Sequence, residues 1–504
     1  MASLRPAIAL LFLSSCFSPP VEAPKTTVEA TTTVQTGQNI KDEVDLLFLV
    51  DDSGSMAPKQ EALKQRFPAL IAMIEGFATQ GHKASYHIGV VTSDLGAPGI
   101  ACGSNLGGKL QQRGLAKSNT PGCVGPVGKP YIDYDQRSGV DNFSSTGQTL
   151  EQTFSCMASV VDPDGTAGGH TGCGFESQLE AVYRALHDPI PENAGFLRPD
   201  ALLAVVWITD EDDCSVDPTS DLFGSNPAYG PLDSYRCAQF GIVCDGMLLP
   251  STPQASFGHC APATPADGGK LTNLDKYVHF FTDPMSAGGL KADPSDVILA
   301  AITAPKDPVA TVSASGNQLC GSGVSTCTNV AHSCVAPDDA AFFGDPSQRL
   351  SYVVEKASSH QLTSICDEDY TAALQGVGAQ IRTHLSPSCL KAPIADVLHP
   401  DCTVEDVTAG GVPTSIPFCG SNGGAAPCWR LCNADDPTNA AGCTPAELIA
   451  LAECSQVCNP HDHTYQVVAI DIERGGAPVK PDTTAHVACN TIAIANEDPD
   501  AACR

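Results

Sequence analysis

The chain has 504 residues, which is too long for one ordinary domain core and predicts two or more domains. Hydrophobic residues make up 42% of it, which is enough to form a core and excludes a globally disordered chain. The formal net charge of -30 argues against nucleic acid as a partner, because such a field repels phosphate backbones and attracts divalent cations.

Residues 1–15 predict an export signal. Arg5 precedes an apolar run at 7–13, and this run is too short to span a bilayer as a permanent helix. The residues Leu13-Ser14-Ser15-Cys16 resemble the lipobox of bacterial lipoproteins, which implies cleavage before Cys16 and acylation of its thiol. The alternative is a plain signal peptide followed by a chance cysteine.

The same resemblance bears on where the protein is displayed. Phe17 stands where an inner-membrane lipoprotein typically carries Asp, which implies a lipid-anchored protein of the outer membrane or cell surface. No later stretch is apolar for about 18 residues, so membrane attachment would depend on the lipid. Residues 16–41 are rich in Pro and Thr without a repeating apolar pattern, which predicts a tether between the lipid and the folded part.

Cysteine usage indicates an oxidising compartment. The chain has 23 cysteines, an odd number that leaves an even remainder if Cys16 carries lipid. The remainder falls into even-numbered blocks, which favours disulfides over reactive thiols, although sequence does not define their connectivity. The blocks are Cys102 and Cys123; Cys156 and Cys173; Cys214, Cys237, Cys244 and Cys260; Cys320, Cys327, Cys334 and Cys366; and ten cysteines from Cys389 to Cys503.

Residues 42–386 predict an α/β domain with a doubly wound, mostly parallel, Rossmann-like sheet. Short continuous apolar runs alternate with helical periodicity, as expected where helices cover both faces of a parallel sheet. The ligand site of such a sheet lies at the carboxyl ends of its strands. Strands are expected at 44–50, 87–92, 202–209, 297–302 and 361–365, and helices at 63–71, 179–186 and 370–381.

Oxygen-bearing side chains follow two of these strands. Asp51, Ser53 and Ser55 come directly after the first strand in FLVDDSGSM, and Asp210 follows another in VVWITDEDD. Hydroxyl and carboxylate oxygens suit a hard cation, above all Mg²⁺, with Ca²⁺ or Mn²⁺ as alternatives. Because serine hydroxyls are neutral, they leave the ion underneutralised, and a carboxylate from a partner would complete its coordination sphere.

The two motifs resemble those of the von Willebrand factor A (vWA) domain. In that family a metal-ion-dependent adhesion site is marked by Asp-x-Ser-x-Ser after the first strand, and a later strand ends in Thr-Asp. The resemblance covers roughly Asp45 to Leu385, with large insertions. It implies that Ser53 and Ser55 are direct ligands, whereas Asp51 and Asp210 act directly or through water.

The family's threonine ligand, in the loop before the third helix, lacks a clear counterpart. The region reads GGHTGCGFESQLEAVYRAL, and helix phase places Cys173 or Gly174 near the threonine position. By resemblance we expect Thr171 to be the ligand, with Glu176 as the alternative. The competing interpretation is a vWA fold whose metal site is degenerate and empty.

Three long insertions, at about 95–147, 211–272 and 303–346, each follow a predicted strand. If those strands are parallel, the insertions emerge on the face that carries the metal. Their cysteines predict a rigid collar with partner specificity, and the alternative is a shield against proteolysis. Asp212 and Asp213 open the second insertion, and they would either hold a second cation or simply be solvated.

Residues 387–504 predict a small β-rich module that depends on disulfides. The segments HTYQVVAIDIE and TTAHVACNTIAI predict two strands of a hairpin or small sheet. The spacings of Cys428 with Cys432 and of Cys454 with Cys458 also fit a zinc site, but the exported setting favours disulfides.

The sequence therefore predicts a non-catalytic envelope lipoprotein that binds a protein or other acidic ligand through a metal-bridged acidic residue, with the membrane reached only through the N-terminal lipid. The alternative is an envelope scaffold with a structural or empty metal site. Catalysis is not expected, because no Ser-His-Asp order, Cys-His pair, GxSxG elbow or HExxH helix occurs.

Overall fold

The computed structural model describes most of the α/β domain and parts of the segments on either side of it. The described residues are 29–37, 43–79, 84–100, 106–114, 123–161, 174–316, 320, 324–367, 369–385, 388–389, 394, 400–408, 412–419, 426–433, 457–459, 464–466, 468–473 and 483–492. The predicted signal peptide, Cys16 and Thr171 lie outside the described residues.

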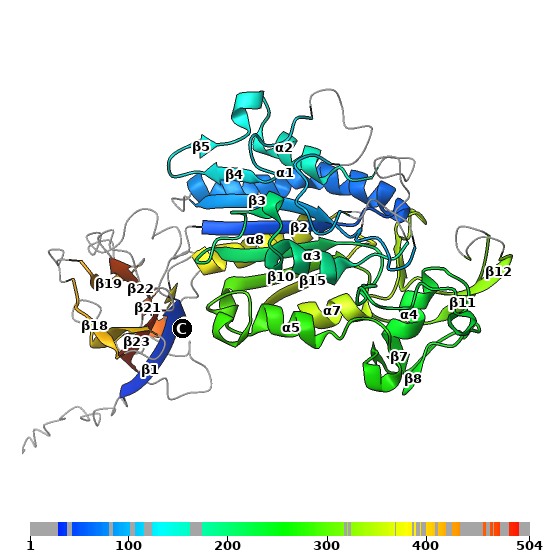
Figure 1. The fold of residues 1–504 in the computed structure, drawn as a ribbon. Helices are drawn as coiled ribbons and strands as arrows, with labels where there is room; N and C mark the ends of the chain where they lie inside the picture. Colours follow the sequence, from blue (N-terminus) through cyan, green and yellow to red (C-terminus); the bar gives the residue numbers. More distant parts are fainter. Residues whose placement is uncertain are drawn as a thin grey trace, which may run out of the picture.

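A seven-stranded sheet forms the centre of the larger domain, in the order β15-β10-β6-β2-β3-β4-β5 (Figure 1). Neighbours from β15 to β3 are parallel, whereas β4 and β5 add antiparallel pairs at one edge. The prediction of a large, mostly parallel sheet is confirmed. The strands are β2 (Glu43–Val50), β3 (Ser85–Thr92), β4 (Ile132–Asp135), β5 (Val140–Asp141), β6 (Leu202–Ile208), β10 (Val297–Thr303) and β15 (Ser359–Ser364).

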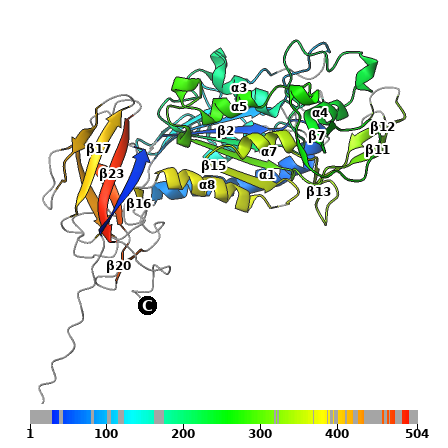
Figure 2. The same cartoon turned by 90° about the horizontal axis from the view of Figure 1, so that it is seen from below.

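Helices cover both faces of this sheet, and Figure 2 shows α1 and α8 on one side of it and α3 and α5 on the other. Successive side chains of β2 point to opposite faces, so Phe48 packs with α1, α2 and α8, whereas Leu49 packs with α3, α5 and α7. The helices are α1 (Ala57–Thr79), α2 (Leu150–Ala158), α3 (Gln178–His187), α5 (Asp275–Thr282), α7 (Gln348–Val354) and α8 (Thr371–Leu385).

The periodicity analysis found the long elements and missed the short ones. Helices α1, α3 and α8 lie where helical spacing was expected, and α1 continues through Pro68. Helices α2, α5 and α7 and the edge strands β4 and β5 were not predicted. Each of these helices spans only two or three turns, and each of these strands only a few residues, which is too short for a periodic signal.

The first insertion extends the sheet, because β4 pairs with β3 and β5 pairs with β4. The disulfide Cys123–Cys156 links this insertion to α2, so the bridge joins two of the cysteine blocks. The first insertion is therefore partly an edge of the sheet, and not only a collar over its carboxyl ends.

The other two insertions carry their own small sheets and bridges. The second contains α4 (Tyr235–Gly241) and a sheet of β7 (Ile242–Cys244), β8 (Met247–Leu248) and β9 (Cys260–Pro262). The third contains the pair β11 (Thr311–Ser315) and β12 (Thr326–Val330) and the pair β13 (Cys334–Val335) and β14 (Phe343–Gly344). The bridges are Cys214–Cys237, Cys244–Cys260, Cys320–Cys327 and Cys334–Cys366.

The C-terminal module is β-rich, with a separate small core that includes Trp429 and Val487. Its disulfides include Cys402–Cys489 and Cys419–Cys428, and the second bridge removes Cys428 from the zinc alternative. The strands are β16 (Ser388–Cys389), β17 (Cys402–Thr408), β18 (Thr414–Ile416), β19 (Cys428–Asn433), β20 (Val457–Asn459), β21 (Thr464–Gln466), β22 (Val468–Glu473) and β23 (Thr483–Ile492).

Two predictions about this module were wrong. The two C-terminal segments expected as a hairpin lie in different sheets, because β22 pairs with β16 and β19, whereas β23 pairs with β17 and β1. Strand β1 (Glu29–Gly37) comes from the segment expected to be only a tether. Its run of Thr and Val favours an extended conformation, and β23, far along the chain, provides the pairing partner.

The pairing of β1 with β23 makes the α/β domain an insertion within the module. The chain leaves β1, enters the domain at Glu43, leaves it after Leu385 and returns to the module at Ser388. Figures 1 and 2 show the module beyond the end of the sheet at which β2 begins. Among the described residues, no helix is both long and apolar enough to cross a membrane.

Candidate functional site

The candidate site lies where the strand order of the central sheet reverses. From β2 the chain continues to β3 on one side, whereas β6 lies on the other side and leads outward to β10 and β15. A reversal of this kind opens a crevice at the carboxyl ends of the two central strands. Val50 is in register with Ile208, so Asp51 and Asp210 leave the sheet close together, as predicted.

The two motif serines and Asp210 form one chain of contacts. Ser53 Oγ lies 3.0 Å from Ser55 Oγ, and the Ser55 hydroxyl donates to Asp210 Oδ1 at 3.1 Å. Gly54–Met56 form a 3-10 turn that leads directly into α1, and this turn brings the alternate serines to the same side. The structure therefore brings together Ser53, Ser55 and Asp210 from segments about 150 residues apart.

Asp51 is completely buried and positions the other members of the site. Its Oδ1 accepts hydrogen bonds from the Ser53 backbone N–H at 2.8 Å and from the Ser93 hydroxyl at 3.2 Å. Its Oδ2 accepts a hydrogen bond from the Thr209 hydroxyl at 2.5 Å. Sequence reasoning missed Ser93 and Thr209, which directly follow the ends of β3 and β6. Because three donors already engage Asp51, contact with a cation through water suits it better than direct ligation.

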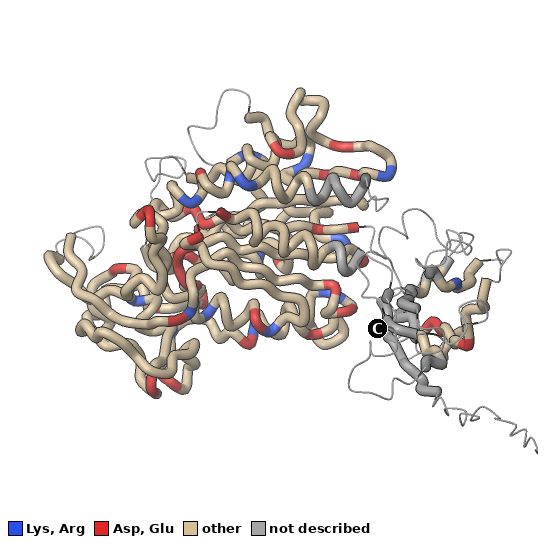
Figure 3. Tube along the Cα trace, turned by 180° about the vertical axis from the view of Figure 1, so that it is seen from behind, with Lys and Arg blue, Asp and Glu red and all other residues tan. Residues whose placement is uncertain are grey.

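Acidic residues gather around this motif, at the carboxyl end of the sheet (Figure 3). Burial and then the charge of Asp210 raise the pKa of Asp51 to about 6. Burial and then Asp51 raise the pKa of Glu176 to about 7, although a hydrogen bond with Glu211 lowers it. Burial and then Glu176 raise the pKa of Glu211 well above its usual value. These carboxyls therefore hold their protons more tightly than exposed carboxyls do, first because they are buried and then because they lie close to one another.

One buried cation was not anticipated. Lys59 pairs with Asp210 Oδ2, and neither side chain is exposed. The Lys59 ammonium also donates to the Ser55 carbonyl at 3.3 Å and lies 4.0 Å from the centre of the Phe343 ring. A signal was present in the sequence, because Lys59 shares a helical stripe with Leu63 and Phe67, one residue every four.

The oxygen separations fit a small octahedral ion. Mg²⁺ binds oxygens at about 2.0 to 2.1 Å, which places adjacent ligands of an octahedron about 2.9 Å apart. The separations of 3.0 Å between the serine hydroxyls and 3.1 Å from Ser55 to Asp210 are close to that value. Ca²⁺, which binds six to eight oxygens at about 2.3 to 2.6 Å and often as a pentagonal bipyramid, also accepts adjacent ligands about 2.7 to 3.1 Å apart, so these separations do not select between the two ions.

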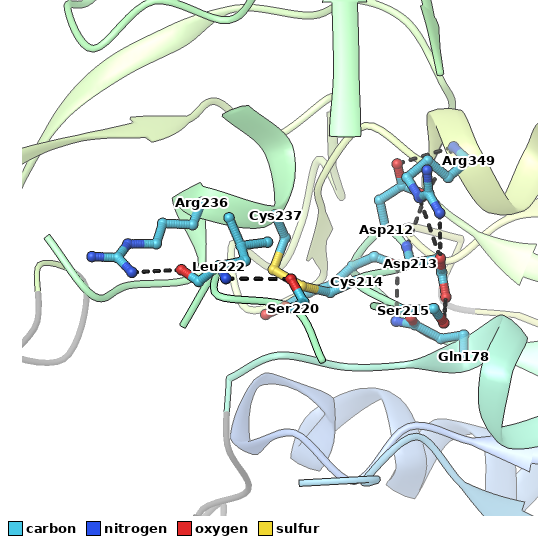
Figure 4. The surroundings of a disulfide bond; sticks show 11 residues. Gln178, Asp212, Asp213, Cys214, Ser215, Ser220, Leu222, Arg236, Cys237 and Arg349 are labelled. Carbon is cyan, nitrogen blue, oxygen red and sulfur yellow. Dashed lines mark hydrogen bonds and ion pairs between the residues drawn. A yellow bond between two sulfur atoms is a disulfide. The ribbon is translucent and has the colours of Figure 1, made fainter. Parts of the chain in front are cut away.

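Asp212 and Asp213 have structural partners, so they do not form a second cation site. Figure 4 shows both side chains directed toward Arg349. Asp212 accepts backbone N–H groups at the start of α7, including those of Arg349 and Leu350. Asp213 pairs with the Arg349 guanidinium at 3.2 Å and accepts a 2.5 Å hydrogen bond from Ser215. These contacts fix the start of the second insertion, next to the bridge Cys214–Cys237.

Thr171 and Glu176 were the two residues expected at the position of the vWA threonine ligand, and only one of them is in the described part of the chain. Thr171 lies outside the described residues, whereas Glu176 is buried near Asp51 and Glu211. Within the described part of the chain, no three His, Cys, Asp or Glu side chains form a group that could hold a metal ion. Any ion here would therefore depend on the hydroxyls of Ser53 and Ser55.

Comparisons with known proteins add little to this geometry. No family model matches the chain, and no curated protein matches it. Among solved structures, the pilus adhesin RrgA of Streptococcus pneumoniae is similar over 92% of this chain and 58% of that protein, with 10% identity and a TM-score of 0.29. This chain thus spans little more than half the length of RrgA. A TM-score this low does not establish a shared fold, so the conclusions below rest on the site itself.

Proposed function

We propose that the protein is a lipid-anchored cell-envelope protein whose α/β domain is a vWA domain, and that this domain binds a protein or other acidic ligand through Mg²⁺. Ser53, Ser55 and Asp210 would hold the ion, and Asp51 and Glu176 would act from the surrounding shell. The ion would supply a positive centre with an open position for an outside carboxylate. No catalytic role is proposed.

One observation carries the proposal: two neutral hydroxyls and one carboxylate oxygen lie at separations of 3.0 and 3.1 Å among carboxyls that raise one another's pKa. A divalent ion there would relieve the repulsion between the carboxyls. The separations admit Mg²⁺, the slightly larger Mn²⁺ or Ca²⁺.

The topology also suits display away from a membrane. The N-terminal segment enters the module through β1, and the module lies beyond the amino end of β2. The candidate site is at the opposite, carboxyl end of β2. If Cys16 carries lipid, the site faces away from the anchored end of the molecule.

The third insertion supports the collar interpretation. Phe343 lies over Lys59, and the Asp345 backbone N–H donates to the Asp210 carbonyl at 2.8 Å. The bridge Cys334–Cys366 fixes this segment beside β15. A ligand that approaches the ion would therefore meet this insertion, which gives it a role in specificity.

The proposal is tested by calorimetric titration with Mg²⁺ and Mn²⁺ of protein from which a chelator has removed any metal. We expect one divalent ion to bind, and we expect Ser53→Ala with Ser55→Ala to abolish binding while thermal unfolding changes little. The matched control is Ser144→Ala with Ser145→Ala, since both of these serines are exposed. Equal binding by the motif variant and the control would reject the site, and a hydrolase screen with Mg²⁺ tests the non-catalytic assignment.

The second candidate function is an envelope scaffold without a functional ion. Lys59 favours it, because a buried ammonium on Asp210 already supplies one positive charge to the site. The scaffold predicts that complexes with envelope partners survive chelation, whereas the adhesion proposal predicts that chelation dissociates them.

A further inference from the structure

Lys59 is placed in the site by three different parts of the chain. Its ammonium contacts Asp210 after β6, the Ser55 carbonyl within the motif, and the Phe343 ring of the third insertion. The side chain is fully buried, and a buried ammonium is retained only where partners compensate for its lost hydration. Its position is therefore fixed by the tertiary structure and does not depend on a flexible surface chain.

Asp210 has one oxygen for each of two roles. Oδ1 accepts from Ser55, on the side where the serine hydroxyls gather, whereas Oδ2 lies against Lys59. A divalent ion held by the hydroxyls and Oδ1 would share this carboxylate with the ammonium. The two positive charges would then repel each other across a single carboxylate that is itself fully buried.

We infer that Lys59 determines the ligand specificity of the metal site, an inference that rests on the proposed function. The ammonium weakens the binding of the ion alone, because both compete for the charge of Asp210. It also makes the ion-loaded site more positive by one unit, whatever the protonation of the neighbouring carboxyls. The loaded site therefore gains more from an anionic ligand, such as a carboxylate of a partner, than it would without Lys59.

The inference predicts effects of opposite sign for one substitution. In Lys59→Met, which keeps the length and apolar stem of the side chain, Mn²⁺ alone should bind about tenfold more tightly or better, since a like charge has been removed at close range. Acetate should bind about tenfold less tightly to the Mn²⁺-loaded variant than to the loaded wild type. If Lys59 had only a structural role, its replacement would not raise the affinity for Mn²⁺ while lowering the affinity for acetate.

The experiment measures Mn²⁺ binding by electron paramagnetic resonance and acetate binding by the loss of water-proton relaxation at bound Mn²⁺. The matched control is Lys64→Met, which removes a charge from the same helix at a partly exposed position. Unchanged affinities in Lys59→Met, or shifts equal to those of Lys64→Met, overturn the inference. If Lys59→Met does not fold, Lys59→Gln replaces it, because an amide can still donate to Asp210 without carrying a charge.

The outcome also separates this inference from the function on which it rests. If wild type binds Mn²⁺ and Lys59→Met binds it equally well, only the inference fails. If neither wild type nor Lys59→Met binds Mn²⁺, both fail. If Lys59→Met binds the ion and wild type does not, competition by Lys59 is supported, and the metal-dependent function of the natural protein is rejected. Thermal unfolding gives a further readout, since Mn²⁺ should raise the melting temperature of Lys59→Met more than that of wild type.

Discussion

Strand β2 carries a buried aspartate near each end, and the two have different surroundings. At the amino end, Asp45 accepts hydrogen bonds from the Arg198 backbone N–H at 2.7 Å and from its Nε at 2.8 Å. At the carboxyl end, Asp51 accepts only neutral donors and faces Asp210 and Glu176. The first carboxylate is matched by a cation from the same chain, and the second is not.

The two carboxyls reach the same pKa for different reasons. Burial raises both values to about 6, but at Asp45 the next influence is the charge of Arg198, which lowers the pKa, whereas at Asp51 it is Asp210, which raises it. The two equal pKa values therefore arise in opposite electrostatic surroundings. An added cation would offset the repulsion at Asp51, whereas Arg198 already supplies positive charge at Asp45.

The largest expected effect comes from making the same substitution at both ends. Asp45→Asn removes the fully buried counter-charge of the half-buried Arg198, which keeps only Glu43 at 3.6 Å, and should lower the free energy of unfolding by about 3 to 5 kcal/mol. Near neutral pH and without metal, Asp51→Asn should stay within about 1 kcal/mol of wild type, because it removes repulsion and Thr209 can turn its hydroxyl to the Glu211 carbonyl at 3.2 Å. Urea unfolding of the metal-free proteins measures the free energy of unfolding of both variants. An equal loss of stability in Asp45→Asn and Asp51→Asn would contradict the comparison.

A smaller effect should separate the bridges near the site from those far from it. Replacing Cys334 and Cys366 with Ser should cost about 2 to 4 kcal/mol of stability and also weaken Mn²⁺ binding, because that bridge holds the segment whose Asp345 N–H positions Asp210. The control variant replaces Cys244 and Cys260, and it should lose similar stability without a change in Mn²⁺ affinity. Thermal unfolding measures the stability of each variant, and calorimetric titration of the folded protein measures its Mn²⁺ affinity. An unchanged Mn²⁺ affinity in the variant without Cys334 and Cys366 would count against the collar.

The smallest effect is the dependence of stability on pH that Asp51 contributes. The folded-state pKa of Asp51, about 6, lies above its ordinary value of 3.8, so between those values the folded state holds more protons than the unfolded chain. The stability of wild type relative to Asp51→Asn should therefore fall by about 1 to 3 kcal/mol as the pH rises from about 4 to about 7. Excess Mg²⁺ should offset this fall. Urea unfolding measures the stability difference between wild type and Asp51→Asn. A difference that does not change across this pH range would indicate that the pKa of Asp51 is not raised.

The alternation of short apolar runs with helical spacing was enough to predict the five parallel strands and three of their helices, since these signals are local in the chain. The spacing of Asp51, Ser53 and Ser55 likewise predicted a common ligand face. Their placement beside Asp210 follows from a strand order that those local patterns favour. In these respects the sequence by itself determined the parallel part of the central sheet and the presence of both motifs at its carboxyl end.

Only the tertiary structure decided which distant segments meet. The pairing of β1 with β23, the use of Asp212 and Asp213 by Arg349, and the position of Lys59 under Phe343 all join residues that carry no mark of their partners in the sequence. Threonines that suit a tether also suit an edge strand, and acidic residues that suit a cation also suit a helix start. Such residues have several locally acceptable roles, and long-range packing selects among them because burial removes the water that would otherwise satisfy each charge or backbone group.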